Sequence, residues 1–583
     1  FAEGTADESI DLSKGTLLKD GDTIKKSGRY QLNGPYTQGI TIDTDDTEGS
    51  VEINVTGNVT VDVPDNVNNF CFITIKKADS VTFNGDAQYP VTVNGGQVIA
   101  NVGGNLTVNG GKYICNVRNP YSSAFILANG SNQVENVTIE SKFTAIWVSL
   151  NCDSAVIKNS EIKKQYSSGA YEGGIVCRTT NGTLDLDHVT VHALEGNALE
   201  LVCGTITIEE GEYTASDGGF AIRAYPEDDD AIDLTITGGT YISKSEYTVA
   251  CLTCYGYKGS KRSNIKINGS KLIGNNQVLW FEGDSAKTLT IDENTILQST
   301  GGRADAVVVG GHGQLFFNSG TIEVSGGSQR SALCTYEEGK AIVDGVTFKG
   351  TKCDIYEEYR YSSVPPCRVQ LKNATFDDTV CNVYLEENRQ IDVDPAYTGQ
   401  VSIECADPKD GRQLTKATAP KGQEKLNLTS ANAGYLVGYK KTKDGQEYRC
   451  LSKTVGVTVS DPEGEVKAGD PAKFTVTLTH ENSTGTGILT FGDKNSEIEY
   501  KDENGVYHRM PDVGLKINLR NGEVEHEFRI APKETGKQTL TAAVKQGEKE
   551  LATDEKDFVV SEMPILTLKD GVITSVTVPG KNG

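Results

Sequence analysis

The stretch Leu234–Tyr241, which reads LTITGGTY, is the unit from which most of the chain is built. Close relatives of it stand at Leu106–Tyr113 (LTVNGGKY), Thr205–Tyr213 (TITIEEGEY) and Ile265–Leu272 (IKINGSKL). Further copies begin near Val137, Val156, Leu184, Leu289, Leu315, Ile342 and Val369. Successive units therefore follow one another roughly 19 to 31 residues apart, which is the period expected of one coil of a solenoid.

Each unit predicts a short strand, a tight turn and the start of another strand. Leu234 and Ile236 point to one face of the first strand and Thr235 to the other, because successive side chains alternate. Gly238 and Gly239 accept a positive φ at little cost, so the chain can bend sharply there. No segment has a helical period long enough for a crossover helix. The repeat therefore predicts a parallel β-helix, in which each strand pairs with its counterpart one turn later.

This repeat resembles that of right-handed parallel β-helix proteins similar to pectate lyases and polygalacturonases. It resembles still more the repeat of β-helix surface proteins of gut-type bacteria. The resemblance covers roughly residues 40 to 395 and rests on the repeat, not on a catalytic motif. It therefore implies the fold and a bacterial surface protein, but no activity. A leucine-rich horseshoe and a propeller fit less well, because the leucine series is absent and two tryptophans cannot mark the blades.

Composition indicates an all-β protein. Among 583 residues there are 63 Gly, 16 Pro and only 2 Met, so turn formers are frequent. We expect very little helix. The predicted fold class is a right-handed parallel β-helix solenoid followed by an immunoglobulin-like β-sandwich.

The predicted domains follow from where the repeat begins and ends. Residues 1–39 are expected to form an N-terminal cap, because an uncovered first coil would expose strand edges and core. Residues 40–395 are the parallel β-helix, and residues 396–453, where the repeat decays, are its C-terminal cap. Residues 454–562 hold about seven alternating strands without cysteine, which predicts the immunoglobulin-like sandwich. Residues 563–583 are expected to be a linker or the start of a further module.

The net charge of −24, from 80 acidic and 56 basic residues, is spread along the chain. Such a field repels nucleic acid and anionic membranes, so no nucleic-acid partner is expected. No apolar run approaches the roughly 18 residues of a membrane helix, so no membrane insertion is expected. Because the first residue is Phe1 and the last ones follow the strand-like Ile573–Val578, we expect a secreted or cell-surface chain cut from a longer protein. We also expect a monomer.

The 13 cysteines all lie at or before Cys450. Because their number is odd, at least one is free or paired with another chain. Most stand singly among strand aliphatics, as in Ile175–Cys177, where a thiol acts as a small core side chain and a stacked internal row is expected. Cys251 and Cys254 have Cys-x-x-Cys spacing, but no second pair and no nearby His complete a zinc site. A core or disulfide role is expected there, and no metal.

Two constellations would fit an enzyme acting on polysaccharides. Gly311–Gly313 is the Gly-His-Gly of hydrolases similar to polygalacturonases, which also need two Asp on adjacent strands as general acid and base. The acidic run Asp228–Asp230 lies about three turns from His312, roughly 15 Å, which is too far for one glycosidic bond, and Asp305 stands alone. A lyase would need a base beside a cation, and Lys258 is the candidate. The catalytic candidates are thus Asp228, Lys258 and His312, although a turn or a charged loop is the commoner explanation for such residues.

Loops between about residues 112 and 260 are long and rich in Tyr, Asn and charge. Sugars dock on aromatic faces that have amides and carboxylates beside them. The charged cluster Tyr356–Tyr361 continues this pattern later in the chain. The candidate ligand-binding residues are Tyr121, Tyr166, Tyr225, Tyr255 and Tyr257 in the loops, Tyr356 in the later cluster, and Trp280 elsewhere in the solenoid. Tyr113, Tyr213 and Tyr241 stand on the repeat itself and are expected to pack.

The first functional hypothesis is an adhesin-like module that binds a polysaccharide or host-surface glycan without catalysis. A polysaccharide lyase or glycoside hydrolase acting along the β-helix is the second hypothesis, and a stalk that presents another domain is the third. No cofactor is expected, although scattered acidic residues leave structural calcium between loops open.

Overall fold

The computed structural model describes residues 15–577 apart from 46–48, 168–171, 228–229, 246–251, 255–262, 284–286, 302–304, 326–330, 351–352, 359–365, 378–380, 419–421, 434, 481–484, 493–495, 520–521, 547–548 and 563–564. The chain divides into two compact units, residues 1–379 and 380–583. The described elements are β-strands except for one 3-10 turn, η1 (Gln423–Lys425), so the expected scarcity of helix is confirmed. Within the described residues, no helix has the length and apolar character needed to cross a lipid bilayer.

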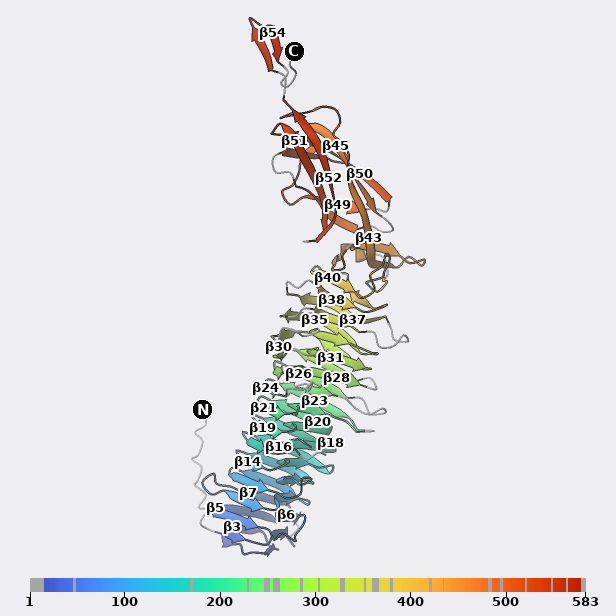
Figure 1. Cartoon of the computed structure of the whole chain (residues 1–583). Helices are drawn as coiled ribbons and strands as arrows, with labels where there is room; N and C mark the ends of the chain where they lie inside the picture. Colours follow the sequence, from blue (N-terminus) through green and yellow to red (C-terminus); the bar gives the residue numbers. More distant parts are fainter. Residues whose placement is uncertain are drawn as a thin grey trace, which may run out of the picture. The chain divides into compact units, whose positions relative to one another are not determined.

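The strands of the first unit stack in three parallel ladders (Figure 1). β10 (Asn105–Asn109), for example, pairs in parallel with β7 (Ser80–Asn84) one turn earlier and with β13 (Gly130–Glu135) one turn later. The chain visits the first, second and third ladder in that order and then repeats the circuit. The unit is therefore a parallel β-solenoid, as the repeat predicts.

Each ladder takes one strand, or part of one, from each turn. The first ladder contains β2 (Thr23–Ile24), β4 (Ile40–Asp43), β6 (Cys71–Lys77), β9 (Gln97–Asn101), β12 (Phe125–Leu127), β15 (Ile146–Val148), β18 (Ile175–Asp187), β20 (Leu199–Glu209), β22 (Ile222–Ala224), β25 (Leu252–Cys254), β28 (Leu279–Gly283), β31 (Val307–Gly311), β34 (Leu333–Thr335) and β36 (Cys353–Glu357). The second contains β1 (Thr16–Leu17), β3 (Gly28–Tyr36), β5 (Ser50–Asp62), β7, β10, β13, β16 (Cys152–Lys158), the far ends of β18 and β20, β23 (Ile232–Thr237), β26 (Asn264–Asn268), β29 (Thr288–Asp292), β32 (Gln314–Phe317), β35 (Lys340–Lys349) and β37 (Cys367–Thr375). The third contains the far ends of β3, β5, β35 and β37 together with β8 (Val91–Asn94), β11 (Lys112–Asn116), β14 (Thr138–Ser141), β17 (Glu161–Lys164), β19 (Thr190–Glu195), β21 (Glu212–Asp217), β24 (Thr240–Ser243), β27 (Lys271–Gly274), β30 (Thr295–Ser299) and β33 (Gly320–Val324).

The stretch LTITGGTY shows why each turn takes this form. In β23, Leu234 and Ile236 are buried and Thr235 is half-buried, as the alternation predicts. Burying each of these aliphatic side chains contributes about 2 kcal/mol. Gly238 and Gly239 have φ values of 72° and 79°, which most other residues avoid, and the chain turns there into β24.

Tyrosines of the repeat form part of the solenoid core. Tyr113, Tyr213 and Tyr241 are each 0% exposed. The rings of Tyr213 and Tyr241, which lie one turn apart, stack with centroids 5.1 Å apart and planes inclined by 3°. The prediction that these tyrosines pack is confirmed.

Cysteines also belong to the core. The structure describes twelve cysteines and joins none of them in a disulfide; ten are buried, and Cys71 and Cys367 are half-buried. Burial raises the pKa of Cys71 and Cys115 to about 12 and that of Cys254 to about 11. For most of them, such as Cys177, the predicted role as a small core side chain is confirmed, while Cys251 lies outside the described residues.

The ladders begin earlier in the chain than expected. β1, β2 and β3 lie within residues 1–39, yet they pair in parallel with β3, β4 and β5 of the following turn. A strand of only two residues, such as Thr23–Ile24, is enough to join a ladder. So short a strand shows too little alternation for the sequence to assign it to a ladder. The assignment of residues 1–39 to a cap stays a prediction.

The second unit starts with parallel strands and continues with antiparallel ones. β38 (Cys381–Leu385) pairs in parallel with β40 (Gln400–Cys405), and β40 with β41 (Asn427–Ser430); β39 (Gln390–Val393) lies between them in sequence. A six-stranded sheet follows in the order β42 (Tyr435–Lys441), β43 (Glu447–Val459), β45 (Ala472–His480), β50 (Gly522–Pro532), β47 (Ser496–Lys501), β48 (Tyr507–Arg509). A five-stranded sheet has the order β44 (Val466–Lys467), β52 (Lys549–Ser561), β51 (Gly536–Gln546), β46 (Gly485–Phe491), β49 (Leu515–Leu519).

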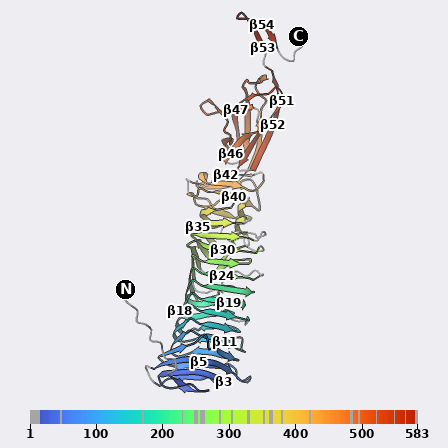
Figure 2. The same cartoon turned by 90° about the vertical axis from the view of Figure 1, so that its left-hand side faces the viewer.

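One apolar core joins the two sheets. Phe474 and Phe528 of the six-stranded sheet and Leu489 and Leu540 of the five-stranded sheet belong to the same buried cluster. Figure 2 shows β51 and β52, which pair in antiparallel fashion, side by side. A two-stranded sheet, β53 (Ile565–Lys569) and β54 (Val572–Thr577), ends the described chain. An immunoglobulin-like topology for these sheets stays a prediction.

Candidate functional site

The central residues of the first-ladder strands lie directly over one another from turn to turn. The residues that share this position from β12 to β36 are Ile126, Trp147, Val176, Glu200, Arg223, Thr253, Trp280, Val308, Cys334 and Tyr356. Their neighbours in the strands, such as Ile146 and Val148, are 0% exposed and form the core. Because alternate side chains point to opposite faces, the ten residues face away from the core. We call them the outer column.

Both tryptophans of the chain belong to the outer column. Trp147 in β15 and Trp280 in β28 are each half-buried, so part of each indole faces solvent. Five turns separate them, which at about 4.8 Å per turn places them about 24 Å apart along the ladder. The first ladder is thus the face on which both indoles remain partly accessible.

Trp280 has a defined set of neighbours. Its indole Nε1 donates a hydrogen bond to the hydroxyl of Tyr336 at 3.4 Å. Tyr336 is 4% exposed and lies against Gly310, where a Cβ would approach Cζ, Cε1 and Oη of the ring more closely than 3.0 Å. Burial, reinforced by nearby Glu282, raises the pKa of Tyr336 well above its usual value. Tyr336 is therefore a neutral phenol that accepts a hydrogen bond from the indole.

The middle of the outer column carries an ion pair. Oε1 of Glu200 lies 3.3 Å from Nη1 of Arg223, and the side chains are 2% and 20% exposed. Glu200 also accepts hydrogen bonds from the amide of Glu172 at 2.6 Å and from Nδ2 of Asn197 at 3.3 Å. Burial raises the pKa of Glu200, and the charge of Arg223 opposes that shift. The guanidinium of Arg223 lies 4.6 Å from the ring centre of Tyr225.

A buried lysine supports the chain that leads into this part of the column. The ammonium of Lys164, which is 0% exposed, donates to the carbonyl oxygen of Glu195. Burial lowers the pKa of Lys164 to about 8, although Glu172, Glu200 and Glu195 act in the opposite direction. Ser167 is held from both sides, because its amide donates to Glu195 at 3.1 Å and its hydroxyl to Glu172 at 2.7 Å. The network holds Ser167 after β17 and Glu172 before β18.

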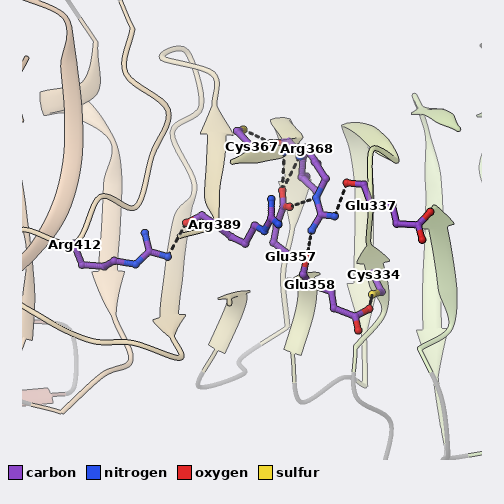
Figure 3. Close-up of polar contacts among 9 residues, drawn as sticks. Cys334, Glu337, Glu357, Glu358, Cys367, Arg368, Arg389 and Arg412 are labelled. Atoms are coloured by element: carbon purple, nitrogen blue, oxygen red, sulfur yellow. Dashed lines mark hydrogen bonds and ion pairs between the residues drawn. The ribbon is translucent and has the colours of Figure 1, made fainter. Parts of the chain in front are cut away.

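A second buried ion pair lies at the end of the first unit (Figure 3). Nε of Arg368 and Oε2 of Glu357 are 2.9 Å apart, and both side chains are 0% exposed. Arg368 also donates to the carbonyl oxygens of Glu337, at 2.9 Å, and Glu358, while Glu357 accepts the amide of Val369 at 2.8 Å. Because these groups are paired and hydrogen-bonded inside the protein, they serve the scaffold and not a ligand.

Within the second unit, an arginine plays a comparable part. Arg412 is 5% exposed and donates through Nη2 to the carbonyl oxygens of Arg389, at 2.9 Å, and Glu386, at 3.0 Å. Its Nε reaches Oδ1 of Asp407 at 2.9 Å. The guanidinium group of Arg412 thus satisfies two backbone carbonyls in the connection between β38 and β39 (Figure 3).

The predicted aromatic ligand-binding residues do not form one site in the described part of the chain. Trp280 lies in the outer column, and Tyr225 lies beside Arg223 of the same column. Tyr121 and Tyr166 are 70% and 46% exposed, on segments that lead into β12 and β18. Tyr255 and Tyr257 lie outside the described residues.

Tyr356 corrects an expectation. It was expected in an exposed charged loop, but it lies in β36, pairs with Cys334 of the preceding turn and is 6% exposed. The physical reason is that Glu357, the next residue, turns inward to Arg368 and draws the segment into the ladder.

The catalytic candidates are not brought together in the described part of the chain. Asp228 and Lys258 lie outside it. His312 is half-exposed, and its Nδ1 lies 2.8 Å from Oε2 of Glu338. Asp305 is 9% exposed and accepts a hydrogen bond from the hydroxyl of Ser331 at 2.7 Å. In the described residues, no group of three His, Cys, Asp or Glu side chains could hold a metal ion.

Sequence reasoning missed Trp147, Glu200 and Arg223. Each stands between two aliphatic core residues of a first-ladder strand, as in Ile146-Trp147-Val148 and Leu199-Glu200-Leu201. That local signal was available, since an aromatic or charged residue enclosed by two core positions must face outward. Aligning the turns at those positions would have revealed the outer column.

No protein-family model and no curated protein matches the chain. Similar solved structures include mutants of the tailspike protein of E. coli bacteriophage HK620. One, in complex with a hexasaccharide, has a TM-score of 0.34, 11% identity and coverage of 88% of this chain and 87% of that one. A double mutant has a TM-score of 0.32 and 12% identity over the same shares. A PapD-like domain of human CEP192 has a TM-score of 0.13 and 12% identity, and covers 19% of this chain and 87% of that one. Similarity at this level carries no argument about what the chain does.

Proposed function

We propose that this protein is a non-catalytic, adhesin-like surface protein that binds a polysaccharide or host-surface glycan along the outer column. The observation that carries the proposal is that both tryptophans of the chain face outward on one ladder and are only half-buried. Tryptophan is enriched at binding interfaces, because its indole offers a large apolar face together with a polar N–H group.

Sugars suit such a face. Their C–H edges pack on indole, and their hydroxyl groups pair with amides, carboxylates and guanidinium groups placed beside it. Glu282 lies two residues after Trp280 in the same strand. Between the two tryptophans, Arg223 and Tyr225 offer a guanidinium group and an aromatic ring to a ligand.

The remaining parts of the chain fit a surface protein. In this proposal, the solenoid is right-handed, as in the proteins similar to pectate lyases, and the protein is a monomer of bacterial origin, secreted or held at the cell surface. The two antiparallel sheets that share one core in the second unit act as an immunoglobulin-like stalk. Structural calcium between acidic loops remains part of the proposal.

Native affinity electrophoresis tests this function. The protein is run through gels cast with plant, mucin-type or bacterial polysaccharides, and each lane is then assayed for new reducing or unsaturated ends. We expect at least one polysaccharide to retard the wild-type protein without forming product. This retardation should be lost in Trp147→Ala and in Trp280→Ala and kept in Tyr89→Ala. Tyr89 is the matched control because it is 37% exposed and lies outside the outer column.

Other results would redirect the proposal. Product formation would favour the polysaccharide lyase or glycoside hydrolase, with Asp228, Lys258 and His312 as the first residues to substitute. Migration that no polysaccharide changes would favour the stalk.

A further inference from the structure

Accessibility along the outer column is interrupted between the two tryptophans. Val176, Glu200 and Thr253 are 0%, 1% and 0% exposed, so other parts of the chain cover the column at these turns, whereas the side chain of Arg223 between them is 20% exposed. Trp147 and Trp280 are half-buried and reach solvent at either end of this interval. The aromatic surface is therefore divided into two separate platforms.

The spacing of the platforms fixes how one ligand could use both. They lie about 24 Å apart along the ladder, and the ladder runs along the solenoid, as β18, β20, β28 and β31 show in Figure 1. A single sugar or a short oligosaccharide can stack on one indole only. A polysaccharide chain that contacts both indoles must run parallel to the solenoid and cross the turns between Trp147 and Trp280.

The charges beside the column favour an uncharged chain. Arg223 is paired with Glu200, and Arg178, two residues beyond Val176 on β18, is paired with Glu227 at 2.9 Å. Each guanidinium is thus already offset by a carboxylate. The net charge of −24 further disfavours a polyanion.

We propose that the outer column holds a neutral polysaccharide chain lengthwise at two separated indole platforms, Trp147 and Trp280, and binds tightly only chains long enough to reach both. This inference rests on the proposed glycan-binding function. Once one platform is occupied, the second contact is intramolecular, so the gain from reaching it is set by effective concentration and is on the order of a hundredfold.

The same argument predicts unequal effects of substitution. For a chain that reaches both platforms, replacing either tryptophan removes the second contact and lowers affinity about a hundredfold. For a short oligosaccharide, the same substitution removes one of two independent sites, so affinity falls about twofold at most. Trp147→Phe and Trp280→Phe retain an aromatic face and are expected to recover most of the loss.

Isothermal titration of the full chain against neutral oligosaccharide series tests the inference. The series are β-1,4-glucan, β-1,4-mannan and α-1,4-glucan from disaccharide to decasaccharide, with a polyuronate series as the charged comparison. For the wild type we expect a step in affinity at one chain length in at least one neutral series. Trp147→Ala and Trp280→Ala should each abolish the step, and Tyr89→Ala should keep it. Far-ultraviolet circular dichroism shows that each variant is folded.

The outcomes separate this inference from the proposed function. Binding that rises smoothly with length, or that depends on one tryptophan only, overturns the two-platform arrangement and leaves glycan binding standing. A step confined to the polyuronates overturns the neutral class. Absence of binding to every series and to the gel polysaccharides overturns both proposals.

Discussion

A methyl group added at Gly310 is expected to dislodge Tyr336 and, with it, the support of Trp280. A Cβ at this position would approach three atoms of the Tyr336 ring more closely than 3.0 Å. Ordinary carbon contacts begin near 3.5 Å, so the ring has to move by about 1 Å or leave its site. Because Tyr336 is only 4% exposed, it has little room to give way.

The size of the effect follows from these contacts. Forcing a methyl group into a packed site costs about 1 to 3 kcal/mol. Displacing the ring also breaks the 3.4 Å hydrogen bond from Trp280, which contributes about 1 kcal/mol at most. We therefore expect Gly310→Ala to lower the free energy of unfolding by about 3 kcal/mol, within the turns around β28 and β31.

Tryptophan fluorescence reports this change directly. In a Trp147→Phe background, Trp280 is the single indole of the chain. Adding Gly310→Ala should shift the emission to longer wavelength, increase quenching by acrylamide and lower the urea midpoint. Gly492→Ala is the control, because a Cβ there would meet Thr541 only at 3.3 Å.

A double-mutant cycle with Tyr336→Ala decides whether the ring is the cause. Once the ring is absent, Gly310→Ala should cost much less, so the two losses should fall well short of additive. If Gly310→Ala lowers stability equally with and without the Tyr336 ring, the steric reasoning is refuted.

Three further predictions concern buried polar groups. Burial lowers the pKa of Lys164 to about 8 from 10.5, so between these values the unfolded chain binds more protons and stability rises with pH. Between these two pH values, the free energy of unfolding of the wild type should rise by roughly 3 kcal/mol relative to that of Lys164→Met. If the urea midpoints of the wild type and Lys164→Met instead change in parallel with pH, the prediction is contradicted. Glu357→Ala leaves the guanidinium of Arg368 buried without its carboxylate and should cost about 3 to 5 kcal/mol, whereas an effect no larger than that of Glu357→Gln would speak against a role of the charge. The buried hydroxyl of Tyr213 has no hydrogen-bond partner among the described residues, so Tyr213→Phe should raise the free energy of unfolding by about 1 kcal/mol, and a lower urea midpoint would disprove it.

The solenoid could be predicted from the sequence because its evidence is local and repeated. Leu234, Ile236 and the glycines after them specify a strand and a turn without reference to the rest of the chain, and each further copy gives the same prediction independently. A copy that is imperfect, such as Thr23–Ile24, still joins a ladder because its neighbours supply the pairing.

The outer column could not be predicted in the same way, because it depends on register between turns. Trp147 and Trp280 stand 133 residues apart in sequence, yet loops of unequal length bring them onto one line. The prediction for Tyr356 was wrong for a related reason. Its charged neighbours predict an exposed loop, but Glu357 pairs with Arg368, eleven residues later, and only the folded chain brings these two side chains together.

The buried thiols have a consequence for how the fold responds to its surroundings. Thiol–disulfide exchange and alkylation proceed through the thiolate, and burial holds the pKa of Cys71 and Cys115 near 12, so little thiolate forms at neutral pH. These two thiols should therefore keep the same covalent state in a reducing and in an oxidising medium. Each buried cysteine becomes accessible only when its own turn opens, so the rate at which an alkylating reagent labels it measures the opening of that turn.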